Sequence, residues 1–305
     1  MRIEVKREVD ANARAAIDNL LHLASLADGH NPLSDHAWLD LVDGGRPGFA
    51  ALVAFQAEHD HPVGYAQVSR APSGGHSWSI DLVIEPHHRM DGESIGSDLV
   101  DEALCVIREQ GGGHVHFWVS HPTAAHDRLA SSAGLAVGRD LLQMRVQLPL
   151  AESTELQVRS FRTGQDEAAW VEVNNRAFDW HPEQGGWTLE TVARREQEPW
   201  FDSEGFLLHE RELDGETRLA GFCWTKIHVD HQPVLGEIYV IAVHPDFQGL
   251  GLGRDLVVAG LASLHARGAP VGMLYVDASN KAAVSLYERI GFAVNHVDRA
   301  YTADV

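Results

Sequence analysis

The segment Gln248–Gly253, Gln-Gly-Leu-Gly-Leu-Gly, is the part of the chain whose residue types point most directly to chemistry. It follows an apolar run, Ile238–Val243, and precedes Arg254–Arg267, whose apolar spacing is typical of a helix. A glycine-rich turn that opens a helix presents backbone N–H groups at the positive end of the helix dipole, and glycine lets an anion approach them closely. The segment therefore predicts a diphosphate-binding loop. The alternative is a turn that only caps an ordinary helix.

The spacing of the glycines distinguishes between kinds of diphosphate ligand. It does not match the dinucleotide fingerprint G-x-G-x-x-G, and no Gly-Lys-Ser/Thr ends it as in nucleotide-triphosphate loops. The pattern Q-x-x-G-x-G after a strand resembles the acyl-CoA loop of the GCN5-related N-acetyltransferases. In that family a second CoA segment reads N-x-x-A-x-x-x-Y followed by G-F, which is matched here by Asn280, Ala283, Tyr287 and Gly291–Phe292. The resemblance implies acetyl-CoA as co-substrate.

Acetyl transfer from a thioester to an amine requires that the reactants are positioned, that the ammonium loses a proton and that the leaving thiolate is stabilised. An α-amino group titrates near about 8, so a carboxylate is an adequate base. Glu237, on the strand beside the loop, is the predicted general base, and Tyr287 is the predicted general acid. The alternatives are an exposed glutamate at the start of a strand and a tyrosine of the core.

The composition is that of an ordinary globular protein, with 305 residues, 44% hydrophobic and 22% charged. This length favours two domains. The formal net charge of −20 argues against nucleic acid as a partner. No apolar run is long enough to span a membrane, and the first residues lack the apolar core of a secretory signal, so we expect a cytoplasmic protein.

The cysteines and histidines give no sign of a disulfide or a metal site. Cys105 and Cys223 lie in apolar segments and are expected to be small core residues. The 19 histidines include His87–His88, His114–His116 and His228–His231, but none of these groups has the spacing of a zinc site on a helix or ribbon. We therefore expect no metal.

The chain contains an internal repeat. Ile80–Pro86 resembles Ile238–Pro245, and Gly96 is expected to open a helix as Gly253 does. The same number of residues separates Gly96 from Gly134 and Gly253 from Gly291. Together with the family resemblance, this predicts an α/β protein of two tandem GCN5-related N-acetyltransferase-type modules, each a mixed sheet flanked by helices. The predicted modules are residues 1–149 and 155–305.

The two modules are not equivalent in sequence. The loop between Pro86 and Gly96 is longer than its counterpart and carries Asp91 and Glu93, two carboxylates that would repel a diphosphate. We therefore expect the first module to be non-catalytic and to bind CoA weakly or not at all, and the second to perform the chemistry.

Longer stretches of the second half, His181–Thr188, Trp200–Asp202, Gly221–His228 and Gly236–Val240, resemble the mycothiol synthase family, which is also tandem. The resemblance implies that acetyl-CoA acetylates the cysteinyl amine of desacetylmycothiol, a cysteine joined to glucosamine and inositol. Family substrate contacts fall on Asp35, Glu183, Lys226, Glu237 and Tyr275. Family CoA contacts fall on Leu82, Val83, Ile84, Ile241, Ala242, Val243, Gln248, Gly249, Leu250, Gly251, Leu252, Gly253, Arg254, Asn280, Lys281, Ala282, Ala283, Val284 and Ser285.

The sequence also allows other interpretations of the acceptor, of Lys226 and of two tryptophans. The acceptor can be another amine, such as an aminoglycoside or a protein N-terminus, and the protein can be a non-catalytic acyl-CoA sensor. Without the family, Lys226 is equally well a surface lysine. Trp187 and Trp224 can pack against sugar faces or belong to the core.

We expect a monomer that binds a small amino-thiol glycoside.

Overall fold

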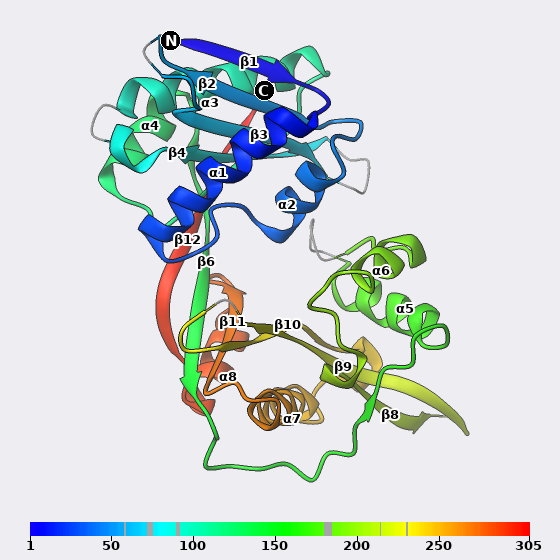
Figure 1. The fold of residues 1–305 in the computed structure, drawn as a ribbon. Coiled ribbons are helices and arrows are strands. Elements are labelled where there is room, and N and C mark those ends of the chain that lie inside the picture. Colours follow the sequence, from blue (N-terminus) through cyan, green and yellow to red (C-terminus); the bar gives the residue numbers. More distant parts are fainter. Residues whose placement is uncertain (58, 72–75, 90–91, 180–184, 214, 230) are drawn as a thin grey trace. The chain divides into compact units, whose positions relative to one another are not determined.

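The computed structural model describes residues 1–57, 59–71, 76–89, 92–179, 185–213, 215–229 and 231–305 (Figure 1). Contacts within the chain divide it into two units. Unit 1 comprises Met1–Asp140 and Val297–Val305, and unit 2 comprises Leu141–His296. Each unit contains a run of neighbouring strands and its own hydrophobic cores.

Unit 1 has the strand order β1-β2-β3-β4-β5-β12. The β4–β5 pair is parallel and the others are antiparallel. In chain order its elements are β1 (Arg2–Lys6), α1 (Ala11–Asp28), α2 (Asp35–Val42), β2 (Ala50–Phe55), β3 (Gly64–Arg70), β4 (Ser77–Ile84), η1 (Pro86–His88), α3 (Gly92–Glu109), β5 (His114–Ser120), α4 (Ala124–Ser132), the start of β6 (Ala136–Gln147) and the end of β12 (Ala293–Asp304).

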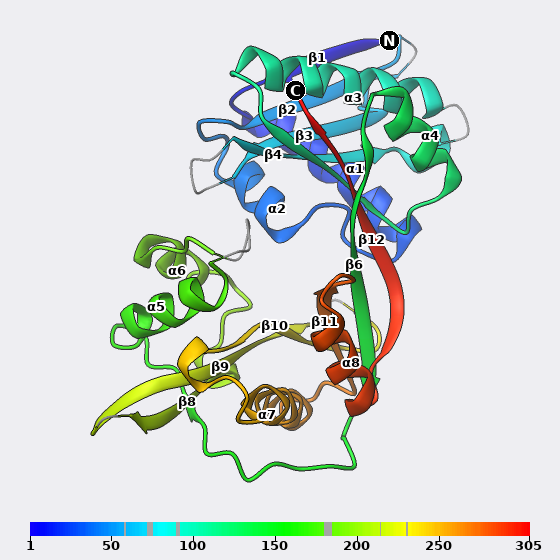
Figure 2. The same ribbon diagram turned by 180° about the vertical axis from the view of Figure 1, so that it is seen from behind.

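Helices cover both faces of the unit 1 sheet because its strands bury both sets of alternating side chains. Leu52 of β2 joins a core with α3, whereas its neighbour Val53 joins a core with α1 and α2. Figure 1 shows α1 crossing one face of the strands, and Figure 2 shows α3 on the other. Helix α1 begins after Asp10, whose carboxylate accepts the first backbone N–H groups, and ends at Gly29 with φ 72°.

Unit 2 has the strand order β6-β11-β10-β9-β8-β7, in which the β10–β11 pair is parallel and the other pairs of described residues are antiparallel. In chain order its elements, after the second part of β6, are β7 (Arg159–Ser160), α5 (Glu167–Ala177), α6 (Leu189–Arg195), η2 (Ser203–Gly205), β8 (Phe206–Leu213), β9 (Glu216–His228), β10 (Leu235–Val243), η3 (Pro245–Phe247), α7 (Leu252–Ala266), β11 (Val271–Asp277), α8 (Lys281–Ile290) and the first part of β12.

The unit 2 sheet is also covered on both faces. On one face α7 and α8 pack against Cys223, Ile238 and Leu274. On the other face α5 and α6 pack against an aromatic core in which Phe206 and Trp224 stack with ring centroids 4.3 Å apart. Trp170 approaches both rings edge-on. These stacked and edge-to-face contacts fix the α5 side of β9 and β10.

The two halves of the sequence exchange parts of strands. The end of β12 pairs with β5 through residues 298–304, although it is the last strand of the chain. The second part of β6, from the first half of the chain, pairs with β11 through residues 141–147. The sequence repeat predicted modules 1–149 and 155–305, whereas the contact-defined boundary lies at Asp140 and Leu141, inside β6. The exchange explains the difference. The sequence repeat shows where a strand begins and ends, but not which unit each part of the strand joins.

The segment 149–154, between the two predicted modules, carries neither helix nor strand. Gly96 does not open its helix, since α3 begins at Gly92 and Gly96 is buried within it. Cys223 is buried as expected, but Cys105 is exposed, so its assignment to the core was wrong. Among the described residues, no helix has both the length and the apolar composition to cross a membrane.

The pairing of β12 with β5 identifies a residue on which the stability of unit 1 depends. Tyr301 of β12 is 1% exposed, packs against Phe117 and donates a hydrogen bond of 2.7 Å to Asp127. We expect Tyr301→Ala to lower the free energy of unfolding by roughly 3–5 kcal/mol, because it leaves a cavity and removes the hydrogen bond to Asp127. Val294→Ala on the same strand, at an exposed position, is the matched control and should change it by less than about 0.5 kcal/mol. Equal urea midpoints for the two variants would contradict this account.

Candidate active site

The parallel strands β10 and β11 separate part-way along their length. Their recorded pairs run from Leu235 with Val271 to Ile238 with Leu274 and then end, although both strands continue. On its other side β10 remains paired with β9 as far as Val243, with a bulge between Ile238 and Val240. The predicted CoA contacts Ile241, Ala242 and Val243 therefore lie where β10 has left β11. Backbone amides at such an edge can pair with amide groups of an extended ligand.

The predicted diphosphate loop leads from this edge into α7. Gly249 and Gly251 have φ values of 78° and 80°, and Gly251 is the N-cap of α7. A Cβ at either position would meet no atom within 4 Å, so the requirement for glycine is one of backbone conformation and open approach. Leu252 is buried against Phe247 and Ala220, which anchors the loop, whereas Leu250 is 57% exposed.

The remaining loop residues have identifiable structural partners. The backbone N–H of Gln248 donates to the Pro245 carbonyl at 3.3 Å, which closes the turn η3. Gly253 lies in the first turn of α7, where backbone N–H groups have no partner within the helix. The guanidinium of Arg254 is paired with the carboxylate of Glu152. Arg254 would have to leave this ion pair before its side chain could contact a phosphate.

The second predicted CoA segment begins α8. Asn280 is the N-cap, and its Oδ1 accepts the backbone N–H of Ala283 at 3.1 Å. The spacing N-x-x-A is therefore that of a helix cap. Lys281, Ala282, Ala283, Val284 and Ser285 form the first turns of α8, and Ser285 Oγ accepts from Arg289 at 2.7 Å.

Three predicted substrate contacts lie on one face of the unit 2 sheet, opposite α7 and α8. Lys226 of β9 is the cross-strand partner of Glu237 of β10, and Glu237 is in register with Met273 of β11. Tyr275 is two residues beyond Met273 and therefore points to the same face. Strand pairing thus gathers an ammonium, a carboxylate and a phenol on one surface. We call Lys226, Glu237 and Tyr275 the polar stripe.

Glu237 and Lys226 are both buried, with exposed fractions of 8% and 7%. This excludes the alternatives of an exposed strand-start glutamate and a solvated surface lysine. Oε2 of Glu237 lies 2.7 Å from Nε2 of His228. Nζ of Lys226 lies 4.7 Å from the ring centroid of Trp200 and 5.8 Å from that of Tyr239. A desolvated ammonium over aromatic faces is held by cation–π attraction.

Tyr275 is the member of the polar stripe that lies on β11. It is 40% exposed, and its hydroxyl accepts a hydrogen bond of 2.8 Å from Nε2 of Gln143, its cross-strand partner on β6. Oε1 of Gln143 in turn accepts from Arg145 at 2.8 Å and from Asn295 at 3.1 Å. Tyr275 is therefore both accessible and oriented.

Tyr287 lies on the opposite face. It is 8% exposed and packs in the core with Phe292, as the alternative interpretation of a core tyrosine expected. Burial, with a smaller effect from Cys223, raises the pKa of Tyr287 to about 12. A phenol with this pKa is protonated at neutral pH and can donate a hydrogen bond. It is a weaker acid than a free thiol, whose pKa is about 8.5, so full proton transfer from it to a thiolate is uphill.

Not every predicted site residue can be placed. Glu183 lies outside the described residues, as does Asp91 of the first-half loop. Asp35 is the first residue of α2, and its side chain, like that of Glu93, lies outside the described part. Trp187 and Trp224 are 5% and 0% exposed in the core beside α5, so the core interpretation is correct for both.

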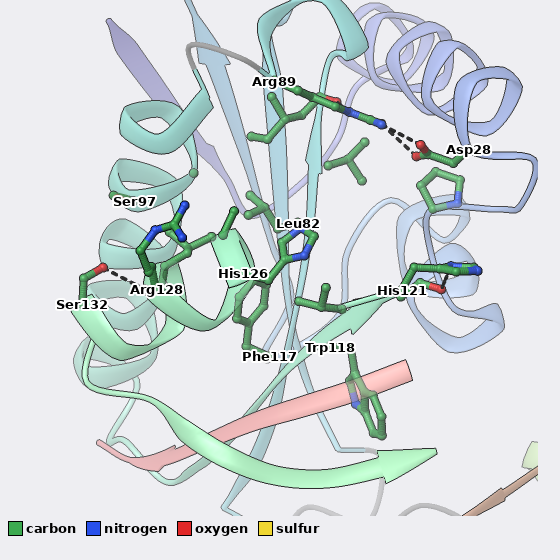
Figure 3. A pocket seen from close by; sticks show the side chains of 18 of the residues that line it. Asp28, Leu82, Arg89, Ser97, Phe117, Trp118, His121, His126, Arg128 and Ser132 are labelled. Atoms are coloured by element: carbon green, nitrogen blue, oxygen red, sulfur yellow. Dashed lines mark hydrogen bonds and ion pairs between the residues drawn. The ribbon is translucent and has the colours of Figure 1, made fainter. Parts of the chain in front are cut away.

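Unit 1 repeats the strand separation and carries a cavity there. The parallel pairs of β4 and β5 end at Asp81 with Trp118, and the next residues are Leu82, Val83 and Ile84. These three residues line a cavity of about 650 Å³ with Gly96 and Ser97. Figure 3 shows Arg89 and Asp28 facing each other on one side of it, joined by hydrogen bonds of 2.6 and 2.8 Å. The bond from Arg89 lowers the pKa of Asp28.

Comparison with known proteins identifies the family. Residues 170–292 match the model of the Acetyltransferase (GNAT) family. The chain is 41% identical to the mycothiol acetyltransferase of Nocardia farcinica, over 98% of this chain and 96% of the relative. It is 44% identical to that of Thermomonospora curvata, over 93% of both chains. The chain belongs to the mycothiol acetyltransferase family.

Members of this family are acyltransferases, and acetyl-CoA is the co-substrate of GNAT enzymes. Two solved structures share the fold over 99% of this chain. They are a GCN5-related N-acetyltransferase from Sphaerobacter thermophilus, with a TM-score of 0.72, 23% identity and 95% of that chain covered, and a tandem GNAT protein from the clavulanic acid biosynthesis pathway, with a TM-score of 0.72, 15% identity and 98% covered. The predicted tandem fold is confirmed.

The family sequence pattern did not indicate two residues that support the stripe. No role was predicted for either His228 or Gln143. The signal for His228 is its two-residue spacing from Lys226 on β9, which places it on the face of Glu237. Gln143 had no such signal, because its pairing with Tyr275 depends on the strand exchange.

The loop conformation gives a test of CoA binding in unit 2. Gly251→Val requires a β-branched residue at φ 80°, which costs roughly 1–2 kcal/mol and tilts the loop amides, so CoA affinity should fall about 5- to 30-fold. Gly268→Val is the matched control, since Gly268 has φ 92° and equally open surroundings beyond the other end of α7. Calorimetric titration with CoA measures both. An equal loss of affinity in both variants would dismiss the loop as the binding site.

Proposed function

We propose that this protein transfers the acetyl group of acetyl-CoA to the cysteinyl amine of desacetylmycothiol, giving mycothiol and CoA. The observation that carries the proposal is near full-length similarity to relatives named mycothiol acetyltransferase. It is supported by the polar stripe, which combines a buried carboxylate, a buried ammonium and an accessible phenol on one surface. Such groups can orient a hydroxyl-rich acceptor that carries one ammonium.

We assign the acetyl donor, acetyl-CoA, to the place where β10 and β11 separate. The free edge at Ile241–Val243 suits the amide groups of the pantetheine arm, which would continue the strand pairing that β11 has left. The amides of Gln248–Arg254 and the α7 dipole suit the diphosphate. Backbone groups make this site attractive to an anion even though the chain has a net charge of −20.

The proton transfers are assigned to Glu237 and its partner. Glu237 takes a proton from the acceptor ammonium, and the free amine then attacks the thioester carbonyl to form the C–N bond. Collapse of the tetrahedral intermediate breaks the C–S bond and releases the CoA thiolate, and the nitrogen passes its second proton to the Glu237 carboxylate after the first has left that group for solvent. His228, 2.7 Å from Glu237 and 18% exposed at its side chain, provides a path from the carboxylate to solvent. Tyr287 stabilises the leaving thiolate by a hydrogen bond.

Lys226 and Tyr275 are assigned to acceptor binding, together with Glu183 and Asp35. Lys226 is held over two aromatic rings beside Glu237, so its ammonium is presented at a fixed point to hydroxyl groups. Tyr275 is fixed by Gln143 while remaining partly exposed. For Glu183 and Asp35, the assignment rests on the family resemblance alone.

We place catalysis in unit 2 because unit 1 lacks the two charged residues. Ile80 joins the core on the α3 side as Ile238 does on the α7 side, so the residue before each, Ser79 or Glu237, faces the opposite way. The cross-strand partner of Ser79 is Ser69, whereas that of Glu237 is Lys226. A pair of serines offers no carboxylate to accept a proton. For Leu82, Val83 and Ile84, contact with a second CoA-type ligand remains a proposal.

Replacement of the base gives one test. Glu237→Gln keeps the shape of the side chain but cannot accept the proton, so turnover should fall by roughly 10²–10⁴. Glu212→Gln, at an exposed position of β8, is the matched control and should leave turnover unchanged. Steady-state assays of CoA release measure both variants. If Glu237→Gln retained normal turnover, the carboxylate would have no role as the base.

The acceptor is tested by a substrate panel. With acetyl-CoA, kcat/KM for desacetylmycothiol should exceed that for glucosamine or an aminoglycoside by roughly 10²-fold or more, since a site built from buried polar groups rejects analogues that leave them unpaired. Similar values for all three amines would remove the acceptor assignment and leave an acetyltransferase of broad specificity. CoA binding without acetylation of any amine would favour the sensor.

A further inference from the structure

Three histidines of unit 1 converge at one end of its sheet. His59 and His61 lie in the connection between β2 and β3, and His88 lies in η1, directly after β4. Each of the three offers a ring nitrogen, and these nitrogens all lie within 4.8 Å of one another. We call His59, His61 and His88 the histidine triad. It belongs to none of the groups that the acetyl transfer uses.

The pairing of three adjacent strands brings the triad together. The Val63 N–H donates to Ala54 at 2.9 Å and the Glu85 N–H donates to Val63 at 3.0 Å, which ties β2, β3 and β4 at this end. Turns fix two of the histidines locally. The His59 N–H donates to Gln56 at 3.1 Å and the His88 N–H donates to Glu85 at 2.9 Å. The position of the triad therefore follows from the backbone of the sheet.

The rings are arranged edge to face. The ring centroid of His59 lies 5.2 Å from that of His61, with an angle of 68° between the ring planes. It lies 4.8 Å from the centroid of His88, with an angle of 86°. Zinc ligated at 2.0–2.1 Å by imidazole in tetrahedral geometry needs nitrogens about 3.4 Å apart. Side-chain rotations that move each ring nitrogen by roughly 1 Å bring the nitrogens to that separation. His61 is exposed and the other two are partly buried, so a cation has access from solvent.

A buried carboxylate, that of Glu85, lies next to the triad. Glu85 is 4% exposed, and its Oε2 accepts the His87 N–H at 2.9 Å and lies 3.9 Å from Nε2 of His88. Metal-binding histidines are commonly oriented by a carboxylate of this kind, which also adds negative charge near the cation. The same carboxylate also caps the turn η1, which holds His88 in place.

We propose that the histidine triad binds a divalent late first-row transition metal, with Zn²⁺ as the reference ion. Three neutral imidazoles are the donor set that Zn²⁺, Co²⁺, Ni²⁺ and Cu²⁺ prefer, and three protein ligands leave a coordination position for water or another ligand. The sequence predicted no metal because the ligands come from two connections whose separation matches no zinc motif. The site would fix the turn before Arg89, which lines the unit 1 cavity.

Titration of the untagged, full-length protein with Co²⁺ tests the proposal, with visible absorption as the readout of imidazole ligation and Zn²⁺ as competitor. The wild type should bind one equivalent. His59→Ala, His61→Ala and His88→Ala should each weaken binding by more than roughly 100-fold, beyond the effect usual for outer-shell residues. His87→Ala is the matched control, since His87 is an exposed neighbour outside the triad, and should bind as the wild type does.

Two outcomes would overturn the proposal. One is the absence of a one-equivalent Co²⁺ spectrum in the wild type, which would leave the triad as neutral rings in edge-to-face packing. The other is equal binding by the triad variants and His87→Ala, which would assign the metal to scattered surface histidines. Thermal unfolding without metal separates misfolding from loss of ligands. Neither readout depends on acetyltransferase activity, so the result is independent of the proposed reaction.

Discussion

The four parallel residue pairs between β10 and β11 are the constraint on which the candidate active site depends. They hold the strands together up to Ile238 and Leu274, so Glu237 is fixed one residue before the separation. Beyond it, β10 keeps its bonds to β9 and loses its partner on the other side. Backbone groups at such an edge need partners, and an extended, amide-containing ligand can supply them. The same separation recurs in unit 1 between β4 and β5, which shows that it belongs to the repeated module.

The two units differ in what the module carries on the face opposite the loop helix. In unit 2, Lys226 and Glu237 are buried charged residues, and burying charges costs stability that their attraction does not reliably return. Unit 1 has Ser69 and Ser79 at these positions, which bear no charge. We propose that the charged pair serves function in unit 2, since the fold forms without it in unit 1. The surrounding aromatic side chains, including Trp200 and Tyr239, exclude water and strengthen interactions with the ammonium.

Much of the fold could be predicted from sequence, because local patterns determine it. The loop glycines, the Asn280 cap and the apolar strand before the loop all lie within short segments whose geometry depends on neighbouring residues. Properties that depend on pairing between distant segments could not be predicted. These include the exchange of β6 and β12, the hydrogen bond from Gln143 to Tyr275 and the histidine triad. The start of α3 was missed because the repeat suggested that Gly96 would act as Gly253 does, whereas the helix begins earlier.

The central claim is that acetyl-CoA binds where β10 leaves β11 and at the start of α7. Amide hydrogen exchange with and without acetyl-CoA, followed by mass spectrometry at peptide resolution, tests it most directly because it reports on the backbone groups to which the claim refers. We predict slower exchange in the segments 241–243 and 248–254 when acetyl-CoA is present. Unchanged exchange in both segments, at acetyl-CoA concentrations that saturate turnover, would contradict the account.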